Sequence, residues 1–216
     1  MNITIIGATG MVGSRLTAEA LSRGHRVVAG SRNPEPRHDD GATSARVDTS
    51  AQASLEAALL GTDVVILSIR AAAGREAGIA GATTAALDAA AAADVPVLVI
   101  GGAGPLRSPH NPDLLVIDDP ARVPPAWRAV AHASTDQLRA CTEHPNGRWT
   151  YLSPPAVLEP GTRTGRYRRG TTTLLTAPDG SSRISVEDLA VAALDEIERP
   201  GTDTHFTVAE TAETPA

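Results

Sequence analysis

The chain contains no lysine, because all 19 of its basic residues are arginine. A Schiff-base lysine, a P-loop lysine and a Tyr-x-x-x-Lys catalytic pair are therefore excluded. Cysteine is nearly absent as well. The lone Cys141 can form no intramolecular disulfide and offers no Cys-based metal site, so we expect no metal centre.

Aromatic residues are also scarce, at 2% of the chain, although 42% of the residues are hydrophobic. The core must therefore consist of Val, Ile, Leu and Ala, a composition that suits helices packed on a β-sheet. Few aromatics and a formal net charge of −6 argue against a nucleic-acid partner. No apolar stretch reaches the roughly 18 residues that span a bilayer. The first apolar run has no basic segment before it, so we expect a cytoplasmic protein with no membrane partner.

Apolar runs of strand length alternate with segments of helical periodicity along most of the chain. The expected strands are 2–6, 26–29, 45–47, 63–68, 97–100, 149–152 and 205–208, and the expected helices are 11–23, 51–60, 75–93, 126–143 and 185–198. This alternation predicts parallel β-α-β units in one domain over residues 1–216. We expect an α/β fold with a Rossmann-type doubly wound parallel sheet; a flavodoxin-like sheet is the alternative.

The C-terminal part has a different texture. Residues 101–125 form a long Gly- and Pro-rich connection, and residues 154–170 are expected to be irregular. We expect segments 154–184 and 200–210 to form a small substrate-side region. Its arginines could attract an acidic substrate or form a solvated strand edge; they are Arg163, Arg166, Arg168 and Arg169.

Three glycines follow the first strand, at Gly7, Gly10 and Gly13. Gly7 allows a sharp turn, Gly10 lets the backbone approach a pyrophosphate, and Gly13 lets the helix pack closely on the sheet. The helix N-terminus presents free N–H groups to the phosphates. The expected cofactor turn comprises Gly7, Thr9, Gly10, Met11, Val12 and Gly13.

The end of the second strand indicates which dinucleotide binds. NAD sites usually place an acid there, yet no acid occurs before Glu35. Arg32 can pair with a 2′-phosphate and Ser31 can add a hydroxyl, so we predict NADP(H). In the alternative, Arg32 is a solvated loop cation.

Asp48 follows the third expected strand. Its carboxylate could accept a hydrogen bond from the adenine amino group, or it could cap the helix that begins near Ala51.

Two further segments leave their strands at the edge where ligands bind in open α/β sheets. Ser68, Ile69 and Arg70 follow the fourth expected strand, and Gly101 and Gly102 follow the fifth. Both segments are expected to line the nicotinamide half of the site.

Several motifs together resemble a known family. They are GATGMVG, SRNPE, DVVILS, VPVLVIGGAG, WTYLSPP, LEPGTRTGRYR and RISVEDLAVAALDEIE. From Met1 to about Val208 the chain resembles the atypical short-chain dehydrogenase/reductases that bind NAD(P)H, within them the NmrA-like, biliverdin/flavin-reductase-like group. The resemblance implies a Rossmann-type domain, NADPH preference and reductase activity. Other members of the group bind the dinucleotide as a redox signal and catalyse nothing.

The chain departs from the typical enzymes of this superfamily at their Tyr-x-x-x-Lys pair. The tyrosine position falls near Arg128 and the lysine position near His132. His132 could hold the ribose or relay a proton, or it could be a surface histidine without a role. Pro154 and Pro155 resemble the turn beside the nicotinamide in this family.

Our functional hypothesis is an NADPH-dependent reductase of a small molecule: a flavin, a quinone or a related conjugated acceptor. Such acceptors can take a hydride from the cofactor and a proton from solvent, without the Tyr/Lys pair. The alternative is a non-catalytic NADP(H)-sensing regulator. A sugar-nucleotide epimerase or dehydratase is disfavoured, because those enzymes generally rely on the tyrosine. A homodimer is the assembly to test.

Overall fold

The structure is a computed structural model that describes residues 1–34, 41–70 and 74–211. Its centre is a sheet of eight strands in the order β3-β2-β1-β4-β5-β6-β10-β8. Neighbouring strands run parallel except that β8 runs antiparallel to β10. In sheet order the strands are β3 (Ala42–Arg46), β2 (Arg26–Ser31), β1 (Asn2–Ile6), β4 (Val64–Leu67), β5 (Val97–Ile100), β6 (Trp149–Ser153), β10 (His205–Glu210) and β8 (Tyr167–Gly170).

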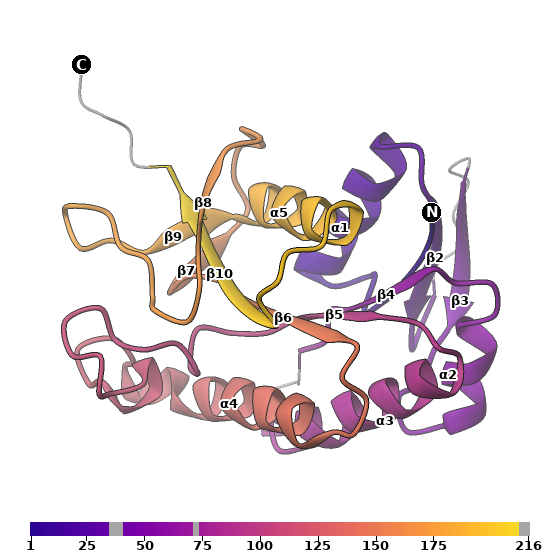
Figure 1. Cartoon of the computed structure of the whole chain (residues 1–216), viewed down its shortest axis with the longest axis horizontal. Coiled ribbons are helices and arrows are strands. Elements are labelled where there is room, and N and C mark those ends of the chain that lie inside the picture. Colours follow the sequence, from indigo (N-terminus) through magenta and orange to yellow (C-terminus); the bar gives the residue numbers. More distant parts are fainter. Residues whose placement is uncertain (35–40, 71–73, 212–216) are drawn as a thin grey trace.

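Helices cover both faces of the sheet (Figure 1). One face carries α1 and α5, and the other carries α2, α3 and α4. The helices are α1 (Met11–Ser22), α2 (Gln52–Ala58), α3 (Gly78–Ala92), α4 (Arg128–Glu143) and α5 (Val186–Glu198), with short 3₁₀ turns η1 (Val116–Asp118) and η2 (Pro125–Trp127). This strand order with helices on both faces is the doubly wound Rossmann arrangement, so the predicted fold class is confirmed.

The central strands are apolar throughout because both of their faces are covered. All four residues of β4 and all four of β5 are buried. On the α1/α5 face, Leu16 and Ala20 of α1 pack with Leu189 and Ala193 of α5. The opposite face is filled mainly by Ala and Leu side chains of α2 and α3, a consequence of the low aromatic content.

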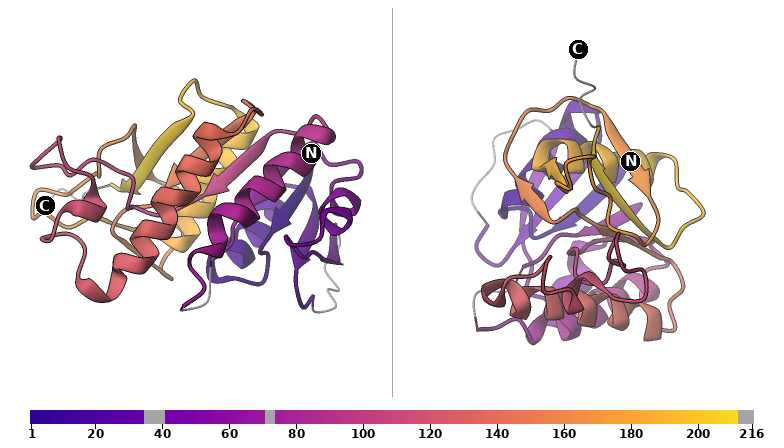
Figure 2. Two further views of the ribbon diagram at one scale, coloured as in Figure 1. Left: turned by 90° about the horizontal axis from the view of Figure 1, so that it is seen from below. Right: turned by 90° about the vertical axis from the view of Figure 1, so that its left-hand side faces the viewer.

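The carboxyl ends of the parallel strands lie along one edge of the sheet. The chain order reverses beside β1, which pairs with β2 on one side and β4 on the other. In open α/β sheets a crevice forms at such a switch point. Figure 2 (left) shows α3 and α4 side by side, with both helices beginning at the lower edge of the view. Since these helices run back from the carboxyl ends of strands, their N-termini mark the crevice edge.

The C-terminal region is more regular than the sequence predicts. Residues 154–170 were expected to be irregular, but they contain β7 (Val157–Glu159) and β8. A strand β9 (Arg183–Ser185), also unpredicted, pairs with β7 in a two-stranded parallel sheet. The final strand β10 lies inside the main sheet between β6 and β8.

An ion pair and several hydrogen bonds connect the segment before β8 to helices α1 and α5. Arg163 donates two hydrogen bonds, of 2.7 and 2.9 Å, to the buried carboxylate of Glu19 on α1. The carboxylate of Asp188 on α5 accepts the backbone N–H groups of Thr164 and Gly165, both at 2.8 Å. The segment before β8 is thus held to both α1 and α5.

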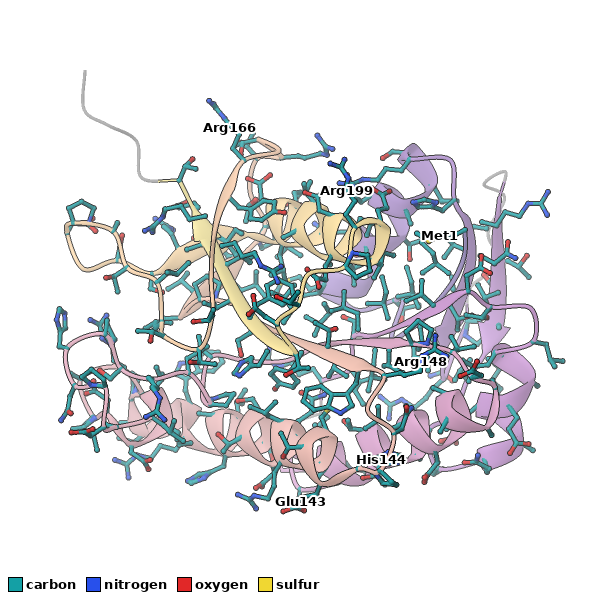
Figure 3. All side chains as sticks on the ribbon, viewed as in Figure 1. Met1, Glu143, His144, Arg148, Arg166 and Arg199 are labelled. Atoms are coloured by element: carbon teal, nitrogen blue, oxygen red, sulfur yellow. The ribbon has the colours of Figure 1, made fainter. Side chains whose placement is uncertain are left out.

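Two arginines of this region, Arg168 and Arg169, lie on the edge strand β8, and attraction of an acidic substrate stays a prediction. Arg169 donates to Glu196 and lies over the ring of Phe206, while Arg168 donates to the carbonyl oxygens of Glu210 and Thr176. They pair within the protein, although β8 does form an edge of the sheet. Arg166 differs, because its side chain extends away from the ribbon (Figure 3).

Two boundaries differ near the N-terminus. The third strand spans Ala42–Arg46 rather than 45–47, and the second spans Arg26–Ser31 rather than 26–29. Edge strand β3 (ATSAR) has little hydrophobic character of its own and forms by pairing with β2 along its whole length. Glu35 lies outside the described residues. No described helix is both long and apolar enough to cross a membrane.

Candidate functional site

The turn after β1 is shaped by Gly7. Its φ of 95° lies in the left-handed region that favours glycine. The N–H groups of Gly7 and Ala8 both donate to the carbonyl oxygen of Gly30, at 2.8 and 3.0 Å. A Cβ on Gly7 would lie 2.0 Å from the carbonyl oxygen of Ser68, so glycine is required for this turn to fit against the end of β4.

The other two glycines have different environments. A Cβ on Gly13 would lie 2.0 Å from the Gly7 carbonyl oxygen, so Gly13 lets α1 pack directly on the turn. Gly10 is exposed, and a Cβ there would meet just one atom at 3.3 Å. Packing within the protein therefore does not require glycine at position 10. A glycine there fits a backbone position that a ligand approaches closely.

The first turn of α1 lies at the same edge of the sheet, directly after the turn that follows β1. Gly10 is its N-cap residue, with no side-chain cap and no acid in the first turn. The N–H groups of Met11, Val12 and Gly13 belong to this turn, where an α-helix has no internal acceptors. Met11 and Thr9 are exposed beside them. The turn thus presents free N–H groups of the kind that bind phosphates at helix N-termini, and phosphate binding here stays a prediction.

The ends of β2 and β3 supply hydroxyl and cationic groups. Ser31 is 6% exposed, and its Oγ has no hydrogen-bond partner among the described residues. Such an orphaned buried hydroxyl is uncommon in proteins and fits a ligand oxygen as its partner. Arg32 is exposed next to it, and Arg46 pairs with Ser31 across the two strands. Neither arginine forms an ion pair with a described residue.

Arg46 was missed by sequence reasoning. The expected strand 45–47 would have placed it in mid-strand, whereas it ends β3 at the crevice edge. Its partner across the sheet, Ser31, lies beyond the expected strand 26–29. The position of Arg46 beside Ser31 depends on the register between β2 and β3, which the local sequence does not reveal.

Asp48 does not cap α2. The N-cap residue is Ala51, and no side chain caps it. Instead, the Asp48 carboxylate accepts the N–H and Oγ of Ser50, at 3.0 and 2.7 Å. These hydrogen bonds, with smaller contributions from the charges of Arg46 and Arg32, lower the pKa of Asp48. The capping expectation is wrong, and an adenine contact remains a prediction.

The segment after β4 borders the glycine turn through the Gly7–Ser68 contact. Ile69 lies partly buried beyond Ser68, against the core under α2 and α3. Arg70 is exposed, and its guanidinium carbon lies 5.8 Å from the ring centroid of Trp127. Trp127 is the second residue near the site that sequence reasoning missed, since nothing local distinguishes it within the expected helix 126–143.

The glycines after β5 accommodate protein side chains. A Cβ on Gly101 would overlap the ring of Tyr151, at 2.0 Å, and one on Gly102 would lie 2.8 Å from the Cβ of Ser134. These two glycines let α4 and β6 approach β5 closely at the crevice edge. Whether they also contact a cofactor stays a prediction.

Pro154 and Pro155 are buried where β6 ends at the same edge. Arg128 and His132 are both exposed on α4, and neither side chain forms a hydrogen bond or ion pair with a described residue. Among the described residues, no neighbouring group orients the His132 imidazole, so its role in holding the ribose or relaying a proton stays a prediction.

Both tyrosines of the chain are engaged in hydrogen bonds within the protein. Tyr151 is fully buried and donates to the Ser134 carbonyl oxygen at 2.9 Å, and burial raises its pKa. Tyr167 donates to Asp195 at 2.8 Å; burial and this hydrogen bond raise its pKa to about 12. Neither side chain is free to act as a proton donor to a ligand.

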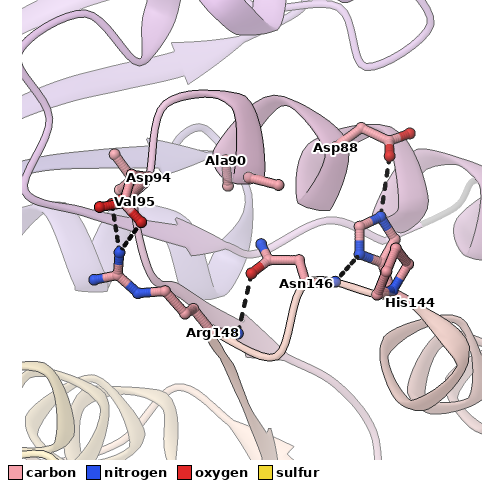
Figure 4. Close-up of a pocket in the computed structure, with 9 residues that line it drawn as sticks. Asp88, Ala90, Asp94, Val95, His144, Asn146 and Arg148 are labelled. Carbon is pink, nitrogen blue, oxygen red and sulfur yellow. Dashed lines mark hydrogen bonds and ion pairs between the residues drawn. The ribbon is translucent and has the colours of Figure 1, made fainter.

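A separate hollow lies near the amino ends of β5 and β6, opposite the crevice edge (Figure 4). Its volume is about 300 Å³. Its polar groups are satisfied internally: Nε2 of His144 lies 3.1 Å from Asp88, its Nδ1 accepts the N–H of Asn146, and Arg148 binds Asp94. None of the residues that line the hollow belongs to the glycine turn.

Comparisons with known proteins agree with this site. A family model described as NAD(P)H-binding matches residues 7–200. A solved structure of a candidate exported protein from Burkholderia pseudomallei is 38% identical, with TM-score 0.87 over 97% of this chain and 99% of that one. A candidate epimerase from Bacteroides thetaiotaomicron is 31% identical, with TM-score 0.89 over 99% of both chains. A candidate NADH-flavin reductase from Streptococcus pneumoniae TIGR4 is 25% identical, with TM-score 0.83 over 98% of this chain and 100% of that one.

The fold and the glycine turn define a Rossmann-type nucleotide-binding protein. Since the family model spans most of the chain, the protein belongs to the NAD(P)H-binding family. The resemblance to NAD(P)H-binding, oxidoreductase-like proteins that the sequence motifs indicated is confirmed.

Proposed function

We propose that the protein is an NADPH-dependent reductase of a flavin, a quinone or a related conjugated acceptor. The observation that carries the proposal is the bare Gly10 turn at the switch point, in a site whose tyrosines are both engaged elsewhere. The similarity to a candidate NADH-flavin reductase supports the same class of reaction.

The preference for NADPH over NADH rests on charge. The ends of β2 and β3 present Arg32 and Arg46, and no acid stands between Gly30 and Pro34 to hold a ribose 2′-hydroxyl. A guanidinium binds a phosphate with charge-assisted hydrogen bonds, often two at once. Ser31 Oγ offers a further hydrogen bond from the same place. These groups fit a 2′-phosphate.

The chemistry places few demands on the protein's own side chains. NADPH, when bound, supplies a hydride from its nicotinamide ring. The acceptor would gain this hydride and one proton from water, and the products would be its dihydro form and NADP⁺. The α1 N-terminus would hold the pyrophosphate, and the segments ending at Arg70 and Gly102 would orient the acceptor.

The absence of a free tyrosine and of lysine favours acceptors of this kind. A ketone needs a proton donor as the hydride arrives, because its alkoxide is strongly basic. Reduced flavins and hydroquinones form stabilised anions, which water can protonate. The engaged Tyr151 and Tyr167 thus argue against alcohol–ketone chemistry and leave this reduction available.

The test is to mix the purified protein with NADPH and a panel of flavins and quinones, and to follow the loss of NADPH absorbance. Acceleration with at least one acceptor is expected. No turnover with any acceptor would refute the proposal. A clear difference in affinity between NADP⁺ and NADPH, without turnover, would instead favour the regulatory alternative.

Two further expectations are carried as proposals. The cytoplasmic location is checked by cell fractionation. The homodimer is checked by size-exclusion chromatography with light scattering, because the scattering reports the mass of the assembly.

A further inference from the structure

Trp127 is unusual among the aromatic residues of this protein. The chain has two Trp, two Tyr and one Phe. Tyr151 and Phe206 are fully buried, and Trp149 and Tyr167 are partly buried. Trp127, by contrast, is 54% exposed. A chain with so few aromatics leaves one of its two indole rings largely on the surface, where it adds little to the core.

The backbone around Trp127 is well defined. Trp127 ends the 3₁₀ turn η2 and directly precedes α4, and its N–H donates to the Pro124 carbonyl oxygen at 2.9 Å. Pro124 and Pro125 restrict the chain just before it. The indole is therefore presented from a rigid position and not from a loose loop.

Its location is the crevice edge. Trp127 contacts Arg70, which follows β4 two residues after Ser68, the residue packed on Gly7. The start of α4 lies at the same lower edge as the start of α3 in Figure 2 (left). The indole thus borders the side of the crevice opposite the β2 and β3 ends, where the nicotinamide half of the site is expected.

The two side chains have complementary properties. The face of an indole stacks with planar conjugated rings and attracts cations. Arg70 lies over this ring, is exposed, and forms no ion pair with a described residue. A surface cation–π pair contributes little to stability, so the fold does not explain why both are placed here.

We propose that Trp127 and Arg70 form the acceptor subsite of the reductase. Trp127 stacks on the planar acceptor, and the Arg70 guanidinium faces the negative charge that the acceptor gains with the hydride, before water supplies its proton. This inference rests on the proposed function. It assigns acceptor binding to these two residues, whereas the NADPH phosphates would bind at the glycine turn.

The experiment uses riboflavin and menadione as acceptors and Trp127→Leu, Trp127→Phe and Arg70→Gln as variants. Stacking on a tryptophan quenches flavin fluorescence, which reports contact with Trp127, and calorimetric titration measures the riboflavin affinity of every variant without turnover. Trp127→Leu is expected to weaken riboflavin binding and raise the KM for both acceptors about three- to tenfold, with NADPH affinity unchanged. Trp127→Phe should restore most of the affinity. Arg70→Gln should lower kcat more than it weakens binding.

Trp149→Phe is the matched control, because Trp149 begins β6 at the opposite edge of the sheet. It should keep the wild-type quenching and KM. Wild-type quenching and KM in Trp127→Leu, with a melting temperature like that of the wild type, would overturn the subsite.

The two proposals can fail separately. If the wild type reduces no acceptor, the reductase proposal fails, and the quenching assay still decides whether Trp127 binds a planar ring. If turnover is normal in Trp127→Leu and Arg70→Gln, the reductase stands and the subsite is refuted.

Discussion

Gly13 packs on Gly7 so closely that a Cβ on Gly13 would lie 2.0 Å from the Gly7 carbonyl oxygen. This contact joins the first helix to the turn that follows the first strand. It makes one glycine of the motif a requirement of the fold, while Gly10, three residues earlier, is open to solvent.

The two glycines should therefore respond differently to alanine. Gly13→Ala forces a clash with backbone and should destabilise the protein by about 3 kcal/mol. Gly10 has a φ of −72°, which alanine adopts readily, so Gly10→Ala should change stability by less than about 1 kcal/mol. It should nevertheless weaken NADPH binding by about 1.4 kcal/mol, or tenfold. Urea denaturation and calorimetric titration measure the two effects, and equal losses of stability would contradict this division of roles.

The arginines at the ends of β2 and β3 should discriminate between the cofactors. Arg32→Ala should weaken NADPH binding by about 1.5–3 kcal/mol and leave NADH nearly unchanged, because a charge-assisted phosphate contact is lost. Arg46→Ala should act in the same direction. Arg26→Ala is the control, since Arg26 begins β2 at the opposite edge. An equal effect of Arg32→Ala on both cofactors would rule out the 2′-phosphate contact.

The Glu19–Arg163 pair should stabilise the protein in a pH-dependent way. Hydrogen bonds from Arg163 and then from Arg23 hold the pKa of Glu19 below its ordinary value of 4.5, against the effect of burial. The stabilisation is therefore complete above pH 4.5 and is lost as the pH falls through the lower folded-state pKa. Glu19→Gln should cost about 1–3 kcal/mol at neutral pH and progressively less in acid. Urea denaturation at several pH values checks this, and a cost that does not vary with pH would count against it.

His205 should make the fold sensitive to mild acid. Burial lowers its pKa from 6.5 to about 4, and its Nε2 lies 2.9 Å from Ser153 Oγ. Between these pH values the unfolded chain binds more protons at this residue, so stability should fall as the pH falls. His205→Asn should remove this part of the slope, while Ser153→Ala, which leaves the imidazole buried, should keep it. An imidazole that titrates near 6.5 in NMR spectra of the folded protein would contradict the prediction.

Local sequence was sufficient for the inner strands and the glycine turn. The runs NITII and VLVI form strands over the predicted ranges, 2–6 and 97–100, because each is rich in β-branched or aliphatic residues and is followed by a glycine. The roles expected of Gly7 and Gly13 follow from the same local logic, since a turn and a close approach both need glycine.

Long-range pairing accounts for what the sequence did not reveal. The strands β7, β8 and β9 are only three or four residues long, and β8 and β9 contain arginine. Ion pairs such as Arg163–Glu19 hold this region from far away in the chain. Arg46 reaches the site through the register of β3 on β2, and Trp127 through its contact with Arg70. None of these relationships leaves a periodic signal in the sequence.

The most direct test of the account is single-turnover reduction of a quinone or flavin by NADPH that carries deuterium on one or the other face of its nicotinamide C4. In a protein that holds the dinucleotide in one orientation, one deuterated form should react more slowly than unlabelled NADPH. The other deuterated form should react at the unlabelled rate. No acceleration over the free reactants, or equal slowing by both forms, would contradict enzymatic hydride transfer at this crevice.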